Sequence, residues 1–169
     1  MMSFHAEVSM RLTYAVLQNM RHRNQGKIIN VASLGAFLPC AKSVQYASTK
    51  AYLVVFSEAL REELRDTNVR VQALCPGFVH TNFHKSDSMQ SIYERRIPKQ
   101  LWMQPEDVVS HSLQSLERDQ VIVVPGRTTR LLGLFMRMPL LKPLVRAATR
   151  APAAPSRSRN HNPQHVANF

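Results

Sequence analysis

The sequence predicts an α/β protein built around a short parallel sheet. Three apolar runs rich in β-branched side chains, at residues 28–32, 69–75 and 121–124, have the length and composition of buried strands. Segments with helical spacing alternate with these runs, as is typical of parallel strands joined by right-handed crossovers. Three strands are few for a doubly wound sheet, and the first element is a helix. We therefore expect part of a larger sheet.

The first half of the chain supplies two helices around the first strand. Apolar residues recur about every 3.6 positions over residues 3–24, which predicts an amphipathic helix, and Gly26 is suited to a left-handed cap after it. Residues 35–43 contain glycine and proline and are expected to form a loop. Residues 44–66 are dense in Ala, Leu and Glu and are predicted to form a long helix.

Three further helical segments are predicted after the second strand, over residues 81–104, 105–118 and 131–150. The first is expected to be a broken, flexible helix. Pro105, followed by two acidic residues, marks the start of the second, because proline and acids favour the amino terminus of a helix. The third is interrupted by two prolines, and the mixture of Pro, Ala, Ser and Arg beyond it predicts disorder.

Composition narrows the class of protein further. The chain has 169 residues, 44% hydrophobic and 20% charged, which is enough for one packed domain and too apolar for a disordered chain. No apolar stretch reaches the roughly 18 residues of a membrane-spanning helix. Two cysteines cannot form a disulfide framework, and the first residues lack the pattern of a secretory signal. We expect a cytoplasmic protein.

The net charge of +11 is concentrated in the carboxyl-terminal part of the chain. Residues 126–169 carry eight Lys and Arg and no acid, which leaves a charge of only +3 for the rest. A basic tail of this kind is usually a solvated extension, so no nucleic-acid partner is predicted. The expected organisation is a partial sheet domain over residues 1–126, an amphipathic segment over 127–150 and a disordered basic tail over 151–169.

Ser33, Tyr46 and Lys50 form the combination that carries chemistry. Ser33 follows the first strand, at the end where open α/β sheets place their ligands. Tyr46 and Lys50 are four residues apart at the start of the long helix and therefore share a face. A phenol has a pKa of about 10, and a nearby ammonium stabilises its ionised form. With a serine hydroxyl to hold a substrate oxygen, this set suits the interconversion of an alcohol and a carbonyl.

A Tyr-x-x-x-Lys pair alone is usually only a surface contact, so its meaning depends on the surrounding sequence. Gly-Lys-Ile-Ile-Asn-Val-Ala-Ser at residues 26–33 precedes the pair, and Val-Arg-Val-Gln-Ala-Leu-Cys-Pro-Gly-Phe-Val-His-Thr at residues 69–81 follows it. In this order and spacing, the three blocks resemble the C-terminal half of short-chain dehydrogenases/reductases, over residues 3–126. The resemblance implies three C-terminal strands of a Rossmann-type doubly wound sheet, NAD or NADP as the cofactor, and hydride transfer at a carbonyl carbon.

The resemblance also implies a role for each residue that matches a family motif. Tyr46 would be the general acid–base, and Ser33 would hold the substrate oxygen. Lys50 would bind the nicotinamide ribose and assist the tyrosine, so that both Tyr46 and Lys50 contact the cofactor. The resembled family further implies a homodimer or tetramer, and a small alcohol or carbonyl compound as the substrate.

Further positions are implied for the cofactor. Pro76 and Gly77 match the turn that lies against the nicotinamide, and Thr81 matches the residue that hydrogen-bonds its carboxamide or a phosphate. His5 stands where the family usually has an asparagine that holds a relay water; a histidine there either serves the relay or is simply exposed. The Gly-rich turn that cradles the pyrophosphate is absent from the sequence, so we expect that about half of the domain is missing.

Two functions from different classes follow from these observations. The first is an NAD(P)-dependent oxidoreductase of the short-chain type. The second is a non-catalytic remnant that acts, if at all, through the dimer interface of the resembled family. An apolar stripe on the long helix either supplies such an interface or is consumed inside the monomer; it consists of Leu53, Phe56, Leu60 and Leu64. Binding of a dinucleotide distinguishes the two functions.

The remaining candidates favour simpler roles. His80 and His84 have a spacing that suits a metal, but no third ligand is close in sequence, so no metal site is predicted. Cys40 and Cys75 are expected to be structural thiols. Residues 131–150 place leucines beside basic side chains, a pattern of either an interfacial membrane helix or a segment that closes over the substrate pocket.

Overall fold

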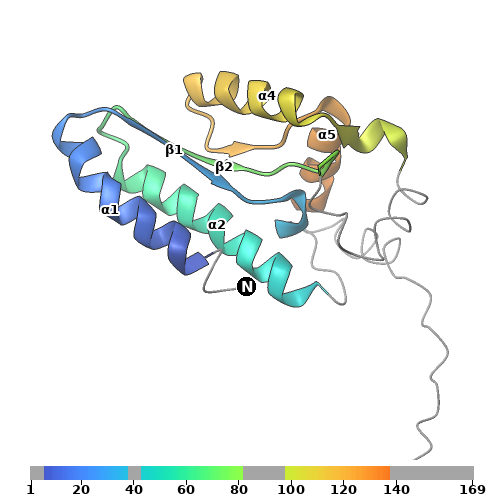
Figure 1. Cartoon of the computed structure of the whole chain (residues 1–169), viewed down its shortest axis with the longest axis horizontal. Coiled ribbons are helices and arrows are strands. Elements are labelled where there is room, and N and C mark those ends of the chain that lie inside the picture. The colour runs from blue at the N-terminus through green and yellow to red at the C-terminus, as the bar shows by residue number, and fades with distance from the viewer. Residues whose placement is uncertain (1–5, 38–42, 82–97, 138–169) are drawn as a thin grey trace, which may run out of the picture.

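The fold is given by a computed structural model, which describes residues 6–37, 43–81 and 98–137. Helices alternate with short strands along the chain (Figure 1). In order, the elements are α1 (Val8–His22), β1 (Gly26–Val31), the 3₁₀ turn η2 (Leu34–Ala36), α2 (Val44–Glu63), β2 (Val69–Leu74), β3 (Phe78–Val79), the 3₁₀ turn η4 (Lys99–Leu101), β4 (Trp102–Met103), α4 (Pro105–Glu117), β5 (Ile122–Val123) and α5 (Arg127–Arg137).

Three parallel strands form the central sheet, in the order β1-β2-β5. β1 and β2 pair over their full length, from Gly26 opposite Val69 to Val31 opposite Leu74, and the short β5 pairs with the end of β2. The predicted α/β class with a parallel sheet is confirmed. A second sheet of two short strands joins β3 to β4 and has no counterpart in the prediction from sequence.

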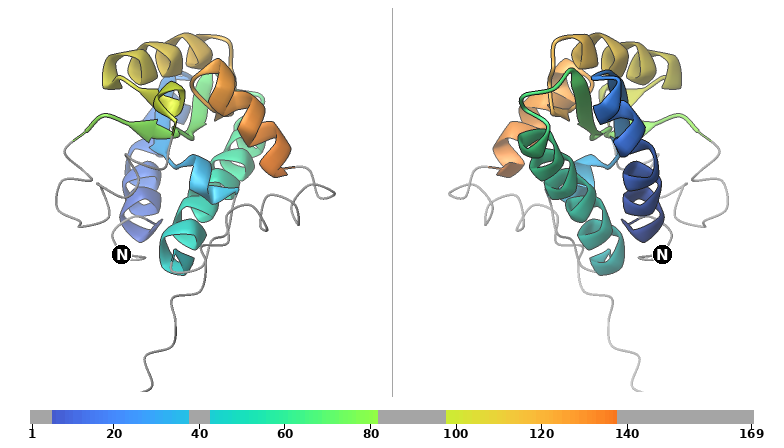
Figure 2. Two further views of the ribbon diagram at one scale, coloured as in Figure 1. Left: turned by 90° about the vertical axis from the view of Figure 1, so that its right-hand side faces the viewer. Right: turned by 90° about the vertical axis from the view of Figure 1, so that its left-hand side faces the viewer.

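Helices cover both faces of the central sheet. α1 and α2 lie against one face and α4 against the other, while α5 lies at the carboxyl end of the strands (Figure 1, Figure 2). Alternate side chains of a strand point to opposite faces. Val71 of β2 packs with Leu60 and Leu64, and Leu74 packs with Val108 of α4. β2 is therefore buried on both sides, which explains its nearly continuous apolar sequence.

Two buried polar contacts dock helices on the sheet. The Nδ2 group of Asn30 on β1 donates a hydrogen bond of 2.9 Å to Ser57 Oγ on α2. On the other face, Gln72 Nε2 donates to the Ser112 carbonyl at 3.1 Å, and Ser112 Oγ donates back to Gln72 Oε1. All four residues are buried. Because each of these side chains has a polar partner, the contacts specify how α2 and α4 sit on the strands.

The end of the first helix differs from the prediction. Asn24, not Gly26, takes the left-handed conformation after α1, with a φ of 49°. An asparagine tolerates this region, and Asn24 Oδ1 accepts a hydrogen bond of 2.8 Å from the Asn68 N–H. Gly26 instead begins β1. The Met20 side chain packs directly against it, since a Cβ atom on Gly26 would lie 2.4 Å from the Met20 sulfur.

The predicted broken helix over residues 81–104 is wrong at its described end. Residues 99–101 form the turn η4, and the next two residues form β4. The Trp102 ring packs against Phe78 of β3, with 5.4 Å between ring centroids. Pairing between β3 and β4, together with this aromatic contact, therefore overrides the helical pattern of the local sequence.

α5 begins four residues before its predicted start. Gly126 turns the chain after β5 with a φ of 82°, and its carbonyl accepts hydrogen bonds from the Arg130 N–H at 2.9 Å and from Thr129 Oγ1 at 3.0 Å. These bonds form the first turn of the helix at residue 127. The rest of the segment predicted over 131–150, from residue 138, and the predicted tail lie outside the described residues. The predicted division of the chain at residue 126 stays a prediction.

Candidate functional site

Ser33 and Tyr46 meet at the carboxyl end of β1. Ser33 lies two residues beyond the strand, and its Oγ accepts a hydrogen bond of 3.1 Å from the Gly35 N–H, which caps η2. Tyr46 lies in the first turn of α2. A Cβ atom on Gly35 would lie 3.4 Å from both Ser33 Oγ and Tyr46 Cε1. The serine hydroxyl and the tyrosine ring therefore flank the same point of the backbone.

Lys50 lies one turn further along α2, on the same face as Tyr46. Its side chain is buried, and Nζ donates a hydrogen bond of 2.8 Å to the Val31 carbonyl at the end of β1. The Nζ atom is 5.9 Å from the centre of the Tyr46 ring. Burial lowers the pKa of Lys50 below its ordinary value, and the nearby Cys75 thiol, when ionised, opposes this shift. Lys50 thus links the strand end to the tyrosine.

The backbone of β1 explains how a lysine is accommodated in this buried place. Ala32 donates its N–H to the Leu74 carbonyl of β2 at 2.7 Å, and neighbouring residues of a strand direct their backbone groups to opposite edges. The Val31 carbonyl therefore points to the outer edge of β1, where no other described strand is paired. The Lys50 ammonium occupies the position that the N–H of a further strand would take.

The turn after β2 closes the site from the side of α5. The Leu34 N–H donates a hydrogen bond of 2.9 Å to the Pro76 carbonyl, which ties η2 to this turn. Gly77 lies against α5 so closely that a Cβ atom would be 2.9 Å from Thr129 Cγ2. A Cβ on Gly133 of α5 would in turn be 3.1 Å from Leu34 Cδ1. The Pro76–Gly77 turn, η2 and α5 therefore form one packed unit beside the Ser33–Tyr46 pair.

Four further residues are singled out by the sequence: Thr81, His5, His80 and His84. Thr81 lies beyond β3, exposed at the end of a described segment, and its role stays a prediction. His5 and His84 lie outside the described residues. His80 is exposed and stacks on the Trp102 ring, with 4.9 Å between ring centres. Among the described residues, no three His, Cys, Asp or Glu side chains gather closely enough to hold a metal ion.

A separate hollow of about 900 Å³ lies at the opposite end of the sheet, where the strands begin. Its lining includes Arg23, Lys27, Arg70 and Glu117, and none of the residues at the Ser33 end. Glu117 forms ion pairs with Lys27 and Arg70, and the hydrogen bonds from these two side chains lower the pKa of its carboxyl. Two of the three cations of this hollow are therefore already paired with Glu117, and the hollow contains none of the residues predicted to carry chemistry.

Sequence reasoning misses two residues next to the cluster. Thr129 abuts Gly77, and the fully buried Cys75, when ionised, raises the pKa of Lys50 against the larger lowering by burial. Cys75 directly precedes the Pro76–Gly77 motif, so its place at the end of a predicted strand is a signal that the sequence does contain. Thr129 carries no such signal, because only the complete fold brings α5 back to the end of β2.

This arrangement supplies two hydroxyl groups and one ammonium at the end of a parallel strand. Two hydroxyls can hold and protonate a single substrate oxygen, and an ammonium can bind ribose hydroxyls or stabilise a phenolate. The groups fit the nicotinamide and ribose end of a dinucleotide. The five glycines of the chain form no Gly-x-Gly-x-x-Gly, so the residues present do not include the cradle for its pyrophosphate.

Comparison with known proteins identifies the family. The family model described as short chain dehydrogenase matches residues 1–91, which is more than half of the chain. The chain belongs to the short-chain dehydrogenase family. It is 32% identical over 123 residues to the 3-oxoacyl-[acyl-carrier-protein] reductase FabG of Chlamydia pneumoniae, a match that covers 68% of this chain and 50% of that protein.

Other members of the short-chain dehydrogenase family show the same partial overlap. The chain is 31% identical over 121 residues to the NADP-dependent 3-hydroxy acid dehydrogenase of Schizosaccharomyces pombe, which covers 68% of this chain and 45% of that protein. The chain spans about half the length of the curated relatives it matches.

Solved structures of short-chain dehydrogenases share the fold. A short-chain dehydrogenase from Burkholderia cenocepacia in complex with NADP gives a TM-score of 0.69 at 20% identity, over 89% of this chain and 59% of that one. One from Sphingobium yanoikuyae in complex with NADPH gives a TM-score of 0.65 at 23% identity, over 89% of this chain and 57% of that one. At this identity the likeness establishes the fold alone, and the predicted partial Rossmann-type sheet is confirmed.

Proposed function

We propose that this short-chain dehydrogenase acts as an oxidoreductase that interconverts an alcohol and a carbonyl with NAD or NADP. The observation that carries the proposal is the meeting of three side chains at the carboxyl end of β1. Ser33 Oγ and the Tyr46 ring edge flank Gly35, and Lys50 Nζ lies 5.9 Å from the ring centre. The relatives support this reaction class, because one is named as a reductase and the other as a dehydrogenase.

Each of these side chains has one step to perform. In carbonyl reduction, Tyr46 gives its hydroxyl proton to the substrate oxygen, and in alcohol oxidation it takes that proton back. Ser33 Oγ donates a hydrogen bond to the same oxygen and so fixes the reacting carbon in place. Lys50 stabilises the tyrosinate that remains after proton transfer. The nicotinamide, when bound, supplies or accepts the hydride at carbon, which balances the proton at oxygen.

The cofactor would contact this chain mainly through its nicotinamide end. Tyr46 and Lys50 would meet the ribose, the Pro76–Gly77 turn would face the nicotinamide, and Thr81 would hydrogen-bond its carboxamide or a phosphate. Two solved family members contain NADP or NADPH, and one curated relative is named NADP-dependent. These relatives support a nicotinamide cofactor and leave NAD and NADP both open, because no residue facing the ribose 2′ position is identified in this sequence.

Dinucleotide binding to this chain is the first test. The residues present reach only the nicotinamide end. We therefore expect NADH and NADPH to bind with a Kd above about 1 mM, which corresponds to a binding free energy of roughly 4 kcal/mol or less. Isothermal titration calorimetry on the chain measures this directly. Micromolar binding would contradict the expectation, because it would mean that the chain also holds the adenine and pyrophosphate sites.

Replacement of Tyr46 tests the catalytic assignment in a version of the domain with a complete cofactor site. Tyr46→Phe keeps the ring and removes the proton, so turnover should fall by about 100-fold or more. Tyr52→Phe is the matched control, because Tyr52 lies on the same helix with its side chain exposed, and it should leave turnover unchanged. Lys50→Ala should weaken cofactor binding and slow turnover together. Near-normal turnover of Tyr46→Phe would remove the tyrosine from the mechanism.

A non-catalytic role through a dimer interface is the second candidate function. Leu53, Leu60 and Leu64 of the predicted stripe are buried in the core, which favours the alternative that the stripe packs inside the monomer. Several apolar residues stay exposed on α1 and α2, among them Leu12, Tyr14, Tyr52 and Val55, and Tyr14 and Tyr52 both pack against Phe56. We expect a dimer through this face, and light scattering that finds only monomer at tens of micromolar would contradict it.

The location of the chain in the cell is proposed on composition. None of the described helices has both the length and the apolar character needed to cross a membrane. The chain holds two cysteines, and the described one, Cys75, is fully buried in the core. Cysteine use of this kind supports a cytoplasmic location, where thiols stay reduced. Fractionation of cells that produce the tagged chain tests this, and recovery from the periplasm or the secreted fraction would contradict it.

A further inference from the structure

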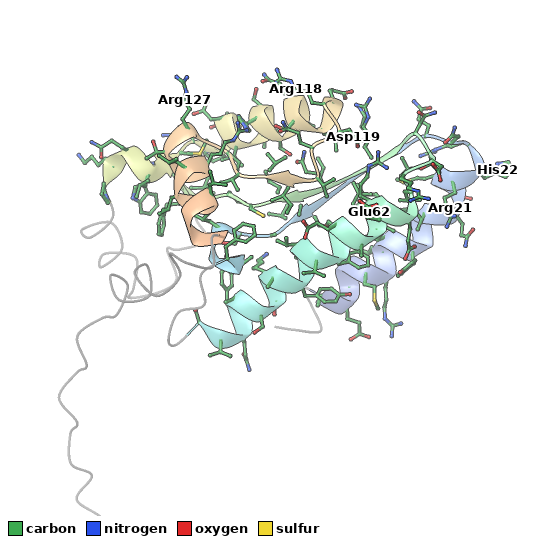
Figure 3. All side chains as sticks on the ribbon, turned by 180° about the vertical axis from the view of Figure 1, so that it is seen from behind. Arg21, His22, Glu62, Arg118, Asp119 and Arg127 are labelled. Atoms are coloured by element: carbon green, nitrogen blue, oxygen red, sulfur yellow. The ribbon has the colours of Figure 1, made fainter. Side chains whose placement is uncertain are left out.

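α5 has two faces with different surroundings. Its inner face carries Thr129, which is 3% exposed, and Gly133, which packs against Leu34 and Val124. Its outer face carries four exposed residues, Arg127, Arg130, Leu131 and Leu134. The two leucines keep 55% and 59% of their surface exposed. In Figure 3, the labelled Arg127 side chain projects away from the body of the protein.

The residues of the outer face are adjacent to one another, because positions three, four and seven apart lie on one side of a helix. A helix that packs against a core normally turns a polar side to water. Scattered exposed leucines are common, but Leu131 and Leu134 are neighbours, and basic residues stand beside them on the same face. Leucine and arginine combined on one exposed face are typical of a helix at the boundary between water and an apolar phase.

The charge of this part of the chain suits a negative surface. Residues 126–169 contain eight Lys and Arg and no acid, whereas the preceding residues are close to neutral overall. Arg130 Nη2 lies 3.2 Å from His111 Nε2 on α4, which occupies only one of the five N–H donors of a guanidinium. Arg127 and Arg130 can therefore direct donors outward, and phosphate groups are their natural acceptors.

We propose that the outer face of α5 binds the surface of a lipid bilayer that contains anionic lipid. Leu131 and Leu134 enter the headgroup region, while Arg127 and Arg130 pair with lipid phosphates. The helix lies on the membrane and does not cross it, because no described helix is long and apolar enough to do so. The inner face remains docked on η2 and the Pro76–Gly77 turn, so the Ser33–Tyr46 pair comes to lie close to the bilayer.

A nucleic acid is the competing partner for a basic surface, and the structure favours the lipid. A phosphate backbone rewards positive charge and gives no role to two exposed leucines between the charges. The exposed leucines are therefore the feature that separates the two partners.

Co-sedimentation of the full chain with vesicles tests the proposal. The probes are vesicles of about seven parts phosphatidylcholine to three parts phosphatidylserine, vesicles of phosphatidylcholine alone, and a short DNA duplex, all at low salt. We expect the chain to pellet with the anionic vesicles and not with the neutral ones. Leu131→Ser with Leu134→Ser should lower partitioning by roughly tenfold or more, since each leucine loses its burial in the bilayer. Arg127→Gln should lower it about fivefold, and addition of salt should do the same.

A matched control pair lies on α4. Val109 and Leu113 are exposed to a similar degree, 55% and 51%, and lie one helical turn apart. Val109→Ser with Leu113→Ser should therefore pellet like the original chain. Circular dichroism should show that this double variant and the Leu131→Ser, Leu134→Ser double variant both fold. A chain that never pellets with anionic vesicles refutes the proposal. If Leu131→Ser with Leu134→Ser pellets as well as the original chain, the proposal is also refuted, because binding would then come from the basic charge alone. Binding of the chain to the DNA duplex but not to the vesicles, unchanged by the two leucine substitutions, would refute it as well.

Discussion

Replacement of Gly77 by alanine would test the packed unit beside the site. The new Cβ would lie 2.9 Å from Thr129 Cγ2, well inside the optimal separation of about 3.5–4 Å for two carbons. Thr129 cannot easily yield, because its hydroxyl is bound to the carbonyls of Pro125 and Gly126 and its side chain is buried. Overpacking costs about 1–3 kcal/mol, and the alanine recovers about 0.4–1 kcal/mol by stiffening the unfolded chain. We therefore expect a net loss of roughly 1–2 kcal/mol in the free energy of unfolding.

Urea unfolding followed by circular dichroism measures the loss, and a second substitution identifies its cause. Thr129→Ser removes the Cγ2 methyl group that the new Cβ would contact and keeps the hydrogen bonds of the hydroxyl group. In the double variant, Gly77→Ala should become nearly neutral, which gives a coupling energy of about 1 kcal/mol or more. Gly35→Ala is the control, because its Cβ would lie at an ordinary 3.4 Å from its neighbours. If Gly77→Ala matches the original chain, or if Thr129→Ser fails to rescue it, the close contact between the turn and α5 is wrong.

Three further predictions concern other parts of the structure. Leu64→Ala should lower the free energy of unfolding by about 2–5 kcal/mol in the same urea assay, because Leu64 is 0% exposed between α2 and the sheet; a loss below 1 kcal/mol would contradict that position. Gln72→Leu should cost about 1–3 kcal/mol, because it leaves the Ser112 hydroxyl buried and unpaired, and adding Ser112→Ala should recover part of the loss. Burial, followed by the charges of Arg130 and Arg118, lowers the pKa of His111. Protonation then opposes folding, so stability should be complete above a pH of about 6.5 and fall as the pH drops through the lowered pKa. His111→Gln should flatten this pH dependence, and an unchanged slope would exclude His111 as its source.

Much of the fold follows from local patterns. The strands at 28–32 and 69–75 are predicted within two residues of their ends, because buried parallel strands need continuous β-branched and apolar side chains. The helix that starts at Pro105 is also predicted correctly, since proline and acids at its first turn form a local signal. The β3–β4 pair is not predicted, because each strand has only two residues, and its formation depends on an aromatic contact between segments far apart in sequence.

The candidate site likewise has a part that the sequence predicts and a part that it does not. The spacing of Tyr46 and Lys50 places both on one helix face without any knowledge of the rest of the fold, and the strand before Ser33 sets the edge at which all three meet. The contact of Gly77 with Thr129 joins residues from β2's end and α5, so no local pattern contains it. The bond from Lys50 to the Val31 carbonyl is likewise invisible in sequence, because it depends on which edge of β1 is open.

That bond has a consequence for any additional strand on the sheet. A parallel strand laid along the outer edge of β1 would bring an amide N–H to the Val31 carbonyl, the same acceptor that Lys50 now uses. The ammonium would then share this acceptor with the amide N–H, which would weaken its own hydrogen bond and leave it freer to turn toward a ribose. The extent of the sheet and the availability of the lysine are therefore coupled through a single carbonyl, so an added strand would act directly on the group that we propose assists Tyr46.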